Sequence, residues 1–122
     1  MPTTPYSLSS GSNGPVASGI TATGASATIF AVQPTPDGDD RTMVFSAVGV
    51  GAVPTAITVD LEISTDGQAT WQKFSTGLAL VAASTPAPQK VTNVPAGPNF
   101  RINATTVTLG SASSVTVNAS CN

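Results

Sequence analysis

Six carboxylates and one cysteine are the residues of this 122-residue chain that could take part in chemistry, because the sequence contains no histidine. Histidine is the commonest general base and metal ligand near neutral pH, and without it Ser-His and Cys-His nucleophile pairs cannot form. Cys121 has no obvious activating neighbour, so we interpret it as an inert thiol. A zinc site would need histidines or clustered cysteines. Apart from the carboxylates, these residue types predict no catalytic centre, no bound metal and no cofactor.

The carboxylates allow two further interpretations. Asp60 and Glu62 share one face of an expected strand, where they could form a glycosidase pair, but a solvated strand face is the simpler interpretation. Asp37, Asp39 and Asp40 could offer oxygen ligands to calcium. Their segment lacks the spacing and the final glutamate of an EF-hand loop, so the sequence leaves calcium binding open.

Charge is scarce in this chain. Charged residues make up 8% of it and the net charge is −2, whereas a typical domain is about 25% charged. The four basic residues are scattered, which argues against a nucleic-acid partner and against an anionic membrane surface. The N-terminal residues have neither the basic region nor the apolar run of a signal peptide. A surface of hydroxyls and small residues is easily desolvated and suits a protein–protein interface.

Hydrophobic residues alternate with polar ones from about residue 27 onwards, most clearly between residues 57 and 64. Turn signals rich in Pro, Gly and Asp separate eight expected strands: 28–32, 42–50, 57–64, 71–76, 78–83, 89–94, 100–105 and 115–120. No segment keeps a helical period for three turns, so parallel strands joined by crossover helices are not expected. The pattern predicts an all-β fold, an antiparallel β-sandwich of immunoglobulin-like or jelly-roll type over residues 27–122.

Residues 1–26 are rich in Pro, Gly, Ser and Thr and hold only isolated apolar side chains. Such a segment buries too little surface to offset its ordering entropy, so we expect a flexible, extended N-terminal arm. The arm is either a frayed terminus or a segment that becomes ordered on a neighbouring subunit. Its candidate partner-binding residues are Pro5, Tyr6, Leu8, Val16 and Ile20.

The most structured phrase of the sequence is EISTDGQATWQKF, residues 62–74. Its spacing of Ser64, Asp66, Gly67, Thr70 and Trp71 resembles the Asp-box hairpin. In that motif the carboxylate ties the loop and the tryptophan packs over the base of the hairpin, which is a structural role. One copy in a short chain does not make the repeated motif of a propeller.

The orientation of Trp71 is open at this point. In a plain two-residue hairpin Trp71 would pair with Glu62 and face outward, while Phe74 would face inward. A longer loop or a bulge after Gly67 would turn Trp71 inward. We expect a buried Trp71, whereas an exposed indole would indicate a sugar-stacking platform.

The hairpin phrase, the later PNFRINATTV strand and the final VTVNAS strand resemble the small β-sandwich proteins of tailed-bacteriophage virions. These include head decoration (cement) proteins and related tail or fibre domains. The resemblance implies a structural, non-enzymatic protein on the capsid exterior that binds the major capsid protein and bridges its neighbouring copies, often as a homotrimer. Two alternatives remain: a tail, neck or fibre component of a virion, and a carbohydrate-binding module.

Overall fold

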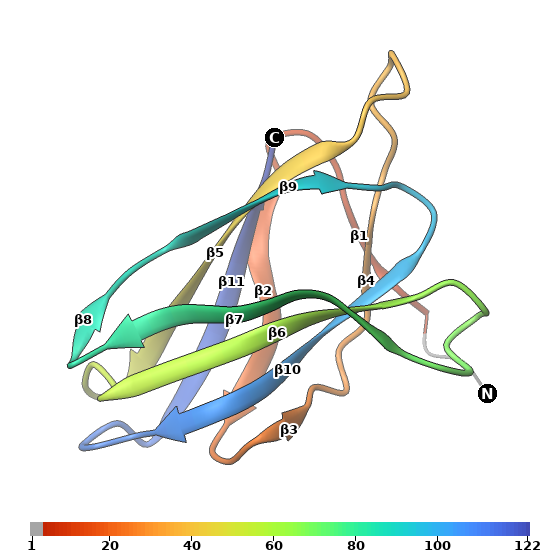
Figure 1. The fold of residues 1–122 in the computed structure, drawn as a ribbon. Helices are drawn as coiled ribbons and strands as arrows, with labels where there is room; N and C mark the ends of the chain where they lie inside the picture. The colour runs from red at the N-terminus through yellow and green to blue at the C-terminus, as the bar shows by residue number, and fades with distance from the viewer. Residues whose placement is uncertain (1–3) are drawn as a thin grey trace.

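The computed structural model describes residues 4–122, which form two β-sheets and contain no helix (Figure 1). One sheet has seven strands in the order β1-β4-β10-β6-β7-β8, with β3 paired to β10, and the other has four in the order β2-β11-β5-β9. The strands are β1 (Tyr6–Leu8), β2 (Asn13–Ile20), β3 (Gly24–Ala25), β4 (Phe30–Val32), β5 (Arg41–Val50), β6 (Ala56–Ser64), β7 (Gln72–Ala82), β8 (Thr85–Pro86), β9 (Gln89–Val94), β10 (Asn99–Thr108) and β11 (Ser114–Cys121). The all-β sandwich that the alternating pattern predicted is therefore confirmed.

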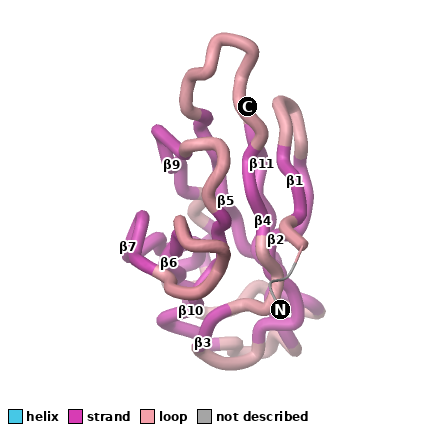
Figure 2. Tube along the Cα trace, turned by 90° about the vertical axis from the view of Figure 1, so that its right-hand side faces the viewer, coloured by secondary structure: helices cyan, strands magenta, loops and turns pink. Residues whose placement is uncertain are grey.

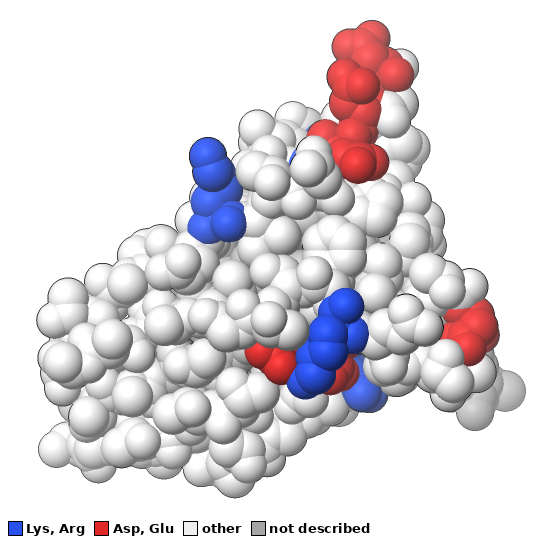
Figure 3. All heavy atoms as spheres, in the orientation of Figure 1, with Lys and Arg blue, Asp and Glu red and all other residues white. Residues whose placement is uncertain are grey.

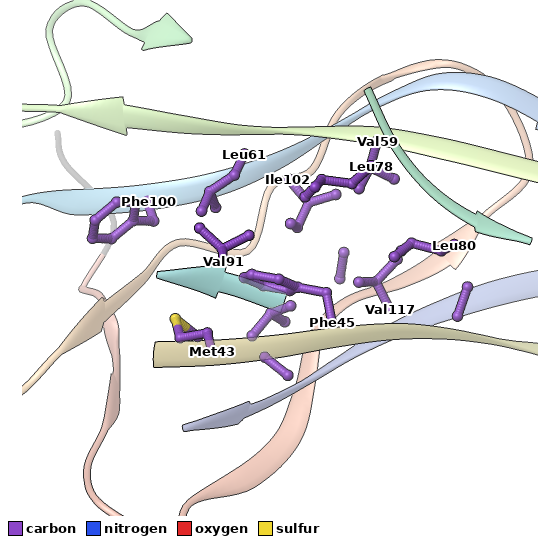
Figure 4. Packing of buried hydrophobic residues seen from close by; sticks show 14 of the residues in the cluster. Met43, Phe45, Val59, Leu61, Leu78, Leu80, Val91, Phe100, Ile102 and Val117 are labelled. Atoms are coloured by element: carbon purple, nitrogen blue, oxygen red, sulfur yellow. The ribbon is translucent and has the colours of Figure 1, made fainter. Parts of the chain in front are cut away.

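The two sheets lie as layers, with β6, β7 and β10 on one side and β2 and β11 on the other (Figure 2). Alternate residues of each strand point into the space between the layers, as the period of two requires. The rings of Phe30 and Phe100 stack with centroids 5.8 Å apart, and Phe45 tilts against Phe30 at 6.3 Å. Aliphatic side chains from both sheets fill the rest of the core, as Figure 4 shows for Leu61 and Val117.

Residues 6–20 belong to this sandwich, so the expectation of a separate arm is wrong for them. Leu8 and Val16 are fully buried, Ile20 packs against the core, and the half-buried Pro5 leads into β1. Of the five candidate arm residues only Tyr6 is exposed. Each of these apolar residues is isolated in the sequence. Leu8 and Val16 nevertheless pack into a core formed by later strands, and this burial stabilises a segment that could not bury enough apolar surface alone.

The main chain of the N-terminal segment is fixed as well. The N–H of Gly11 donates to the carbonyl oxygen of Cys121, and the N–H of Cys121 donates to that of Ser12. β2 then pairs antiparallel with β11. The start of the chain is thus hydrogen-bonded to its last strand, a contact between residues about a hundred positions apart that local sequence does not indicate. Residues 1–3 lie outside the described part of the chain.

Two further expectations about strands are corrected. β1 pairs in parallel with β4, Tyr6 opposite Phe30, although no helix connects them; the chain crosses to the other sheet through β2 and returns. The expected strands 71–76 and 78–83 form one strand, β7. Gly77, the residue between the two expected strands, has a positive φ of 68° inside β7, a conformation that glycine adopts without strain.

Arg41, at the start of β5, is the buried cation of the fold, with 5% of its surface exposed. Its guanidinium donates to the main-chain carbonyl oxygens of Gln33, Pro34 and Asn122, the last at 2.6 Å. These bonds offset the cost of burying the charge and hold the β4–β5 loop against the end of β11.

Candidate functional site

The hairpin loop between β6 and β7 is closed by one carboxylate. Oδ1 of Asp66 accepts hydrogen bonds from the Ser64 hydroxyl and the Thr70 N–H, both at 3.0 Å, and Oδ2 accepts one from the Thr70 hydroxyl at 2.5 Å. The Ser64 hydroxyl in turn accepts the N–H of Gln68 at 2.9 Å. Gly67 and Gln68 both have positive φ angles, of 71° and 75°. The loop therefore has the geometry that the Asp-box-like spacing suggests, with Asp66 tying both of its sides.

These hydrogen bonds define the protonation state of Asp66. Donation from the Thr70 hydroxyl, then from the Thr70 N–H and the Ser64 hydroxyl, lowers the pKa of Asp66 to about 2. All of these donors favour the charged form of the carboxylate. Asp66 is therefore ionised over the whole physiological pH range. Its negative charge is stabilised by the donors of Ser64 and Thr70 in the same hairpin.

Trp71 does not enter the core, which corrects the expectation of a buried indole. It is half-buried on the outer side of the seven-stranded sheet, where the guanidinium of Arg101 lies 4.4 Å from the ring centroid. A bulge does occur in β7, since Glu62 pairs with Lys73 while Leu61 pairs with Ser75. The bulge does not turn Trp71 inward. Phe74 faces inward, as it would in a plain hairpin, and its ring lies edge-on to that of Phe100 with the centroids 5.7 Å apart.

Beside the hairpin, a row of charged side chains crosses three strands on the outer face of the same sheet. Arg101 on β10 pairs with Glu62 on β6, which pairs with Lys73 on β7. Arg101 donates to Glu62 at 2.7 Å, Asn103 donates to Glu62 at 2.9 Å, and Lys73 lies 2.5 Å from Asp60. Two acids and two bases thus neutralise one another within this group, which we call the charged row (Asp60, Glu62, Lys73, Arg101 and Asn103).

The carboxylates of the charged row are ionised. Burial raises the pKa of Asp60, but hydrogen bonds from the Lys73 ammonium and the Gly77 N–H outweigh it and hold that pKa below its usual value. Burial likewise raises the pKa of Glu62, and donation from Asn103 and Arg101 brings it below the usual value. A glycosidase needs one carboxyl group with a raised pKa to act as the acid. Asp60 and Glu62 are both ionised, so neither carboxyl group is suited to act as that acid.

Asp37, Asp39 and Asp40 are exposed on the β4–β5 loop, which projects at the top of Figure 3 as an acidic group. The loop is tied by Thr35, whose hydroxyl accepts the N–H of Asp39 at 2.7 Å. Over residues 4–122 no group of three or more His, Cys, Asp or Glu side chains is arranged to hold a metal ion.

Cys121 is buried, and burial raises the pKa of its thiol, although the positive charge of Arg41 opposes that effect. It is therefore protonated at neutral pH. The described part of the chain has no helix that could cross a membrane.

Sequence reasoning missed three members of the charged row: Lys73, Arg101 and Asn103. The signal was present, because Arg101 and Asn103 alternate with the buried Phe100 and Ile102 and must point outward. The missing information was the register, which sets Arg101 opposite Glu62 across 39 residues of sequence. Ser64, Asp66, Gly67, Thr70 and Trp71 do lie together, in the hairpin.

No family model matches this chain, and neither any curated protein nor any solved structure matches it. The fold defines it as a two-sheet, all-β protein.

Proposed function

We propose that this protein is a structural component of a bacteriophage virion. It binds the outside of the assembled capsid and stabilises the shell by bridging neighbouring major capsid proteins. The proposal extends the resemblance carried by the hairpin phrase and the last two strands, and the homotrimer that the resemblance implies stays a prediction. One observation supports it above the others: a complete end of the sandwich carries no charge.

Three stretches of sequence run to this uncharged end, and each is free of Asp, Glu, Lys and Arg: residues 42–59, 74–89 and 102–122. Their turns meet in the structure. The N–H of Ser84 donates to the carbonyl oxygen of Thr55, and the N–H of Thr55 donates to that of Thr108. Ser113 donates its N–H to Val50. The end that carries β8 and these turns shows neither blue nor red in Figure 3.

An uncharged end of this kind suits adhesion to a large protein surface. Interface cores are poor in charge and bury small and apolar groups, and contacts without ion pairs change little with salt. Val53, on the β5–β6 loop of this end, is 50% exposed and supplies an apolar centre. Many copies on one particle would add up individually weak contacts.

The carbohydrate-binding alternative lacks an open aromatic platform. One face of the Trp71 ring is covered by Arg101, and the carboxylates beside it are held by Lys73, Arg101 and Asn103. Among residues 4–122, Tyr6 is the single aromatic residue that is exposed, while Trp71 and Phe74 are half-buried. The arrangement therefore favours a mechanical role for the hairpin.

The proposal is tested by adding purified protein to phage particles assembled without it and measuring co-sedimentation. We expect saturable binding that persists from ~0.1 to ~1 M salt, since no ion pair is needed. Val53→Lys should abolish binding, while Thr65→Lys, which adds the same charge at an exposed site of the β6–β7 loop, outside all three stretches, should bind normally.

Electron microscopy of particles saturated with the protein then locates it. Density on the capsid exterior supports the proposal. Density confined to the tail, neck or fibres would assign the protein to the alternative component of the virion, and absence of binding to any part of the particle would overturn both.

A further inference from the structure

The chain contains two Asp-Gly dipeptides, Asp37-Gly38 and Asp66-Gly67, and each lies in an exposed loop. In such a dipeptide the main-chain nitrogen of the glycine can attack the carboxyl carbon of the aspartate before it, because glycine has no Cβ that obstructs the approach. The reaction needs the nitrogen within about 3.3 Å of Cγ and a carboxyl group that is free to turn. The two loops differ in how they hold the carboxyl group.

The carboxylate of Asp66 is not free to turn. Its two oxygens accept hydrogen bonds from the Ser64 hydroxyl, the Thr70 N–H and the Thr70 hydroxyl, and rotation toward Gly67 would break them. The same donors lower the pKa of Asp66 to about 2. An ordinary aspartate has a pKa near ~3.9, so the neutral acid, which is the form that expels water, is about 100-fold rarer at Asp66.

The carboxylate of Asp37 has no such restraint. It lies at the tip of the β4–β5 loop (Figure 3), and none of the described residues donates a hydrogen bond to it. The loop is tied below the tip, where the Thr35 hydroxyl accepts the N–H of Asp39 at 2.7 Å. The N–H of Gly38 donates to the carbonyl oxygen of Thr35 at 3.0 Å, and an exposed hydrogen bond of this kind opens at little cost in free energy. Both groups that the reaction needs are therefore available at Asp37.

We propose that Asp37 is a site of spontaneous modification in the folded protein, where it converts to isoaspartate, and that the hairpin protects Asp66 from the same reaction. The Gly38 nitrogen forms a bond to Cγ of Asp37, and the carboxyl hydroxyl leaves with the proton of that nitrogen as water. Water then adds to the cyclic succinimide. Addition at Cγ restores aspartate, whereas addition at the main-chain carbonyl carbon breaks the bond of that carbon to the Gly38 nitrogen and leaves the main chain running through Cγ. No oxidant or other co-reactant takes part.

The Asn13-Gly14 dipeptide could react by the same route with loss of ammonia, but the fold restrains it. It lies in β2, where Asn13 pairs with Ser120 and Gly14 pairs with Ala119 of β11. Ring closure requires a rotation of the main chain that a paired strand cannot make without losing ladder hydrogen bonds. Of the three dipeptides, Asp37-Gly38 is therefore the one with neither a tied side chain nor a strand-paired main chain.

The modification does not rest on the virion role, and it is tested on the purified full-length chain. The protein is aged for several weeks at neutral pH, one sample folded and one unfolded in guanidinium chloride, and both are digested with trypsin. Cleavage after Arg41 and Lys73 places the two Asp-Gly dipeptides in different peptides, and electron-transfer fragmentation distinguishes isoaspartate from aspartate in each. In the unfolded sample both sites should react at similar rates. In the folded sample Asp37 should react at least ~10-fold faster than Asp66, the scale on which one hydrogen bond acts.

Two variants identify the cause. Asp37→Glu keeps the charge but lengthens the side chain, which disfavours ring closure, so isoaspartate should disappear from that position. Thr70→Val removes the hydroxyl that donates to Asp66 and should raise the rate at Asp66, while Asp37 in the same chain stays unchanged and serves as the internal standard. Equal rates at the two sites of the folded wild type, a faster reaction at Asp66, or no isoaspartate at Asp37 would overturn the proposal. An unchanged rate at Asp66 in Thr70→Val would overturn the protection by the hairpin.

Discussion

Arg101 and Trp71 form a stacked pair, with the guanidinium carbon 4.4 Å from the centroid of the indole ring. The same guanidinium donates from Nε to Glu62, at 2.7 Å. One side chain of β10 therefore joins the end of the hairpin loop to a buried carboxylate of β6. The pair connects the charged row with the hairpin, and it explains how a half-buried tryptophan is stabilised outside the core.

Removing this connection should cost stability. Arg101→Ala leaves Glu62 buried with fewer donors and uncovers the indole, so we expect a loss of about 2 kcal/mol in the free energy of unfolding. Arg101→Lys should recover part of it, because an ammonium keeps the charge but not the planar stacking. Urea unfolding measures both. Lys90→Ala, which removes an exposed cation, should change the free energy of unfolding by less than ~0.5 kcal/mol. A loss as large as that of Arg101→Ala would show that the contacts of Arg101 with Glu62 and Trp71 are not the cause.

Acid should destabilise the hairpin through protonation of Asp66. The pKa of Asp66 is lowered in the folded protein to about 2, below its value in the unfolded chain, so its contribution is complete above the unfolded pKa and is lost as the pH falls toward 2. Asp60 and Glu62 also have lowered pKa values, and their contributions have the same sign.

Asp66→Asn separates the hairpin from the other carboxylates. The stability difference between wild type and Asp66→Asn should be largest at neutral pH and should shrink between pH ~4 and ~2, as the wild-type carboxylate is protonated. Urea midpoints at several pH values measure it, with Asp37→Asn on the exposed β4–β5 loop as the comparison. A difference that is constant down to pH ~2 would show that the charge of Asp66 contributes nothing.

The N-terminal strands should be essential for folding. Leu8→Ala should destabilise the protein by about 3 kcal/mol, because it opens a cavity in a fully buried site. Tyr6→Ala is the matched control on the same strand, since that side chain is 45% exposed, and it should cost less than ~1 kcal/mol. Thermal unfolding distinguishes the two. Deletion of residues 1–20 should yield an unfolded chain, and a folded deletion variant would restore the arm interpretation.

Two substitutions in the turn between β7 and β8 should stabilise the protein. Ala82 pairs with Thr85, and the two residues between them, Ala83 and Ser84, have positive φ angles of 49° and 60°. This is the backbone that Asn-Gly prefers. Replacing the pair by Ala83→Asn and Ser84→Gly should raise the free energy of unfolding by about 1 kcal/mol.

Gly67→Ala provides a control of opposite sign for that experiment. Its φ is 71° and no atom lies within 4 Å of an added Cβ, so the change introduces backbone strain alone. It should destabilise by about 1 kcal/mol. Stabilisation by both changes would indicate that backbone conformation is not the cause.

Periodicity in the sequence was sufficient where strand neighbours follow one another along the chain. The alternation of residues 57–64 predicted β6 and the direction of its side chains, but the outward Asp60 and Glu62 are buried among their partners and not solvated as expected. The Asp-Gly turn predicted the hairpin. Leu8 and Val16 could not be placed in this way, because their burial depends on residues that lie far away in sequence. Local composition measures only what a segment can bury by itself.

The misplaced Trp71 has a different cause. Strand parity in a plain hairpin already pointed it outward, and the assumption of a longer loop or bulge after Gly67 led to the opposite expectation. One face of the indole ring is instead covered by the guanidinium of Arg101, a residue 30 positions later in the sequence. Cross-strand register decides such a contact, and a single sequence does not define register between strands that are not joined by a short turn.

The parallel pairing of β1 with β4 has a mechanical consequence. Tyr6, at the start of β1, and Cys121, at the end of β11, are separated along the strand direction, because the chain runs the length of β1 before Gly11 and Ser12 hydrogen-bond to Cys121. Tension applied between them would pull β1 and β11 lengthwise, in shear against the strands beside them. The ladder bonds run across the strands, so those of each terminal strand would be loaded together rather than broken one after another. A fold with this geometry is expected to resist stretching from its ends more strongly than one that unzips from a free hairpin.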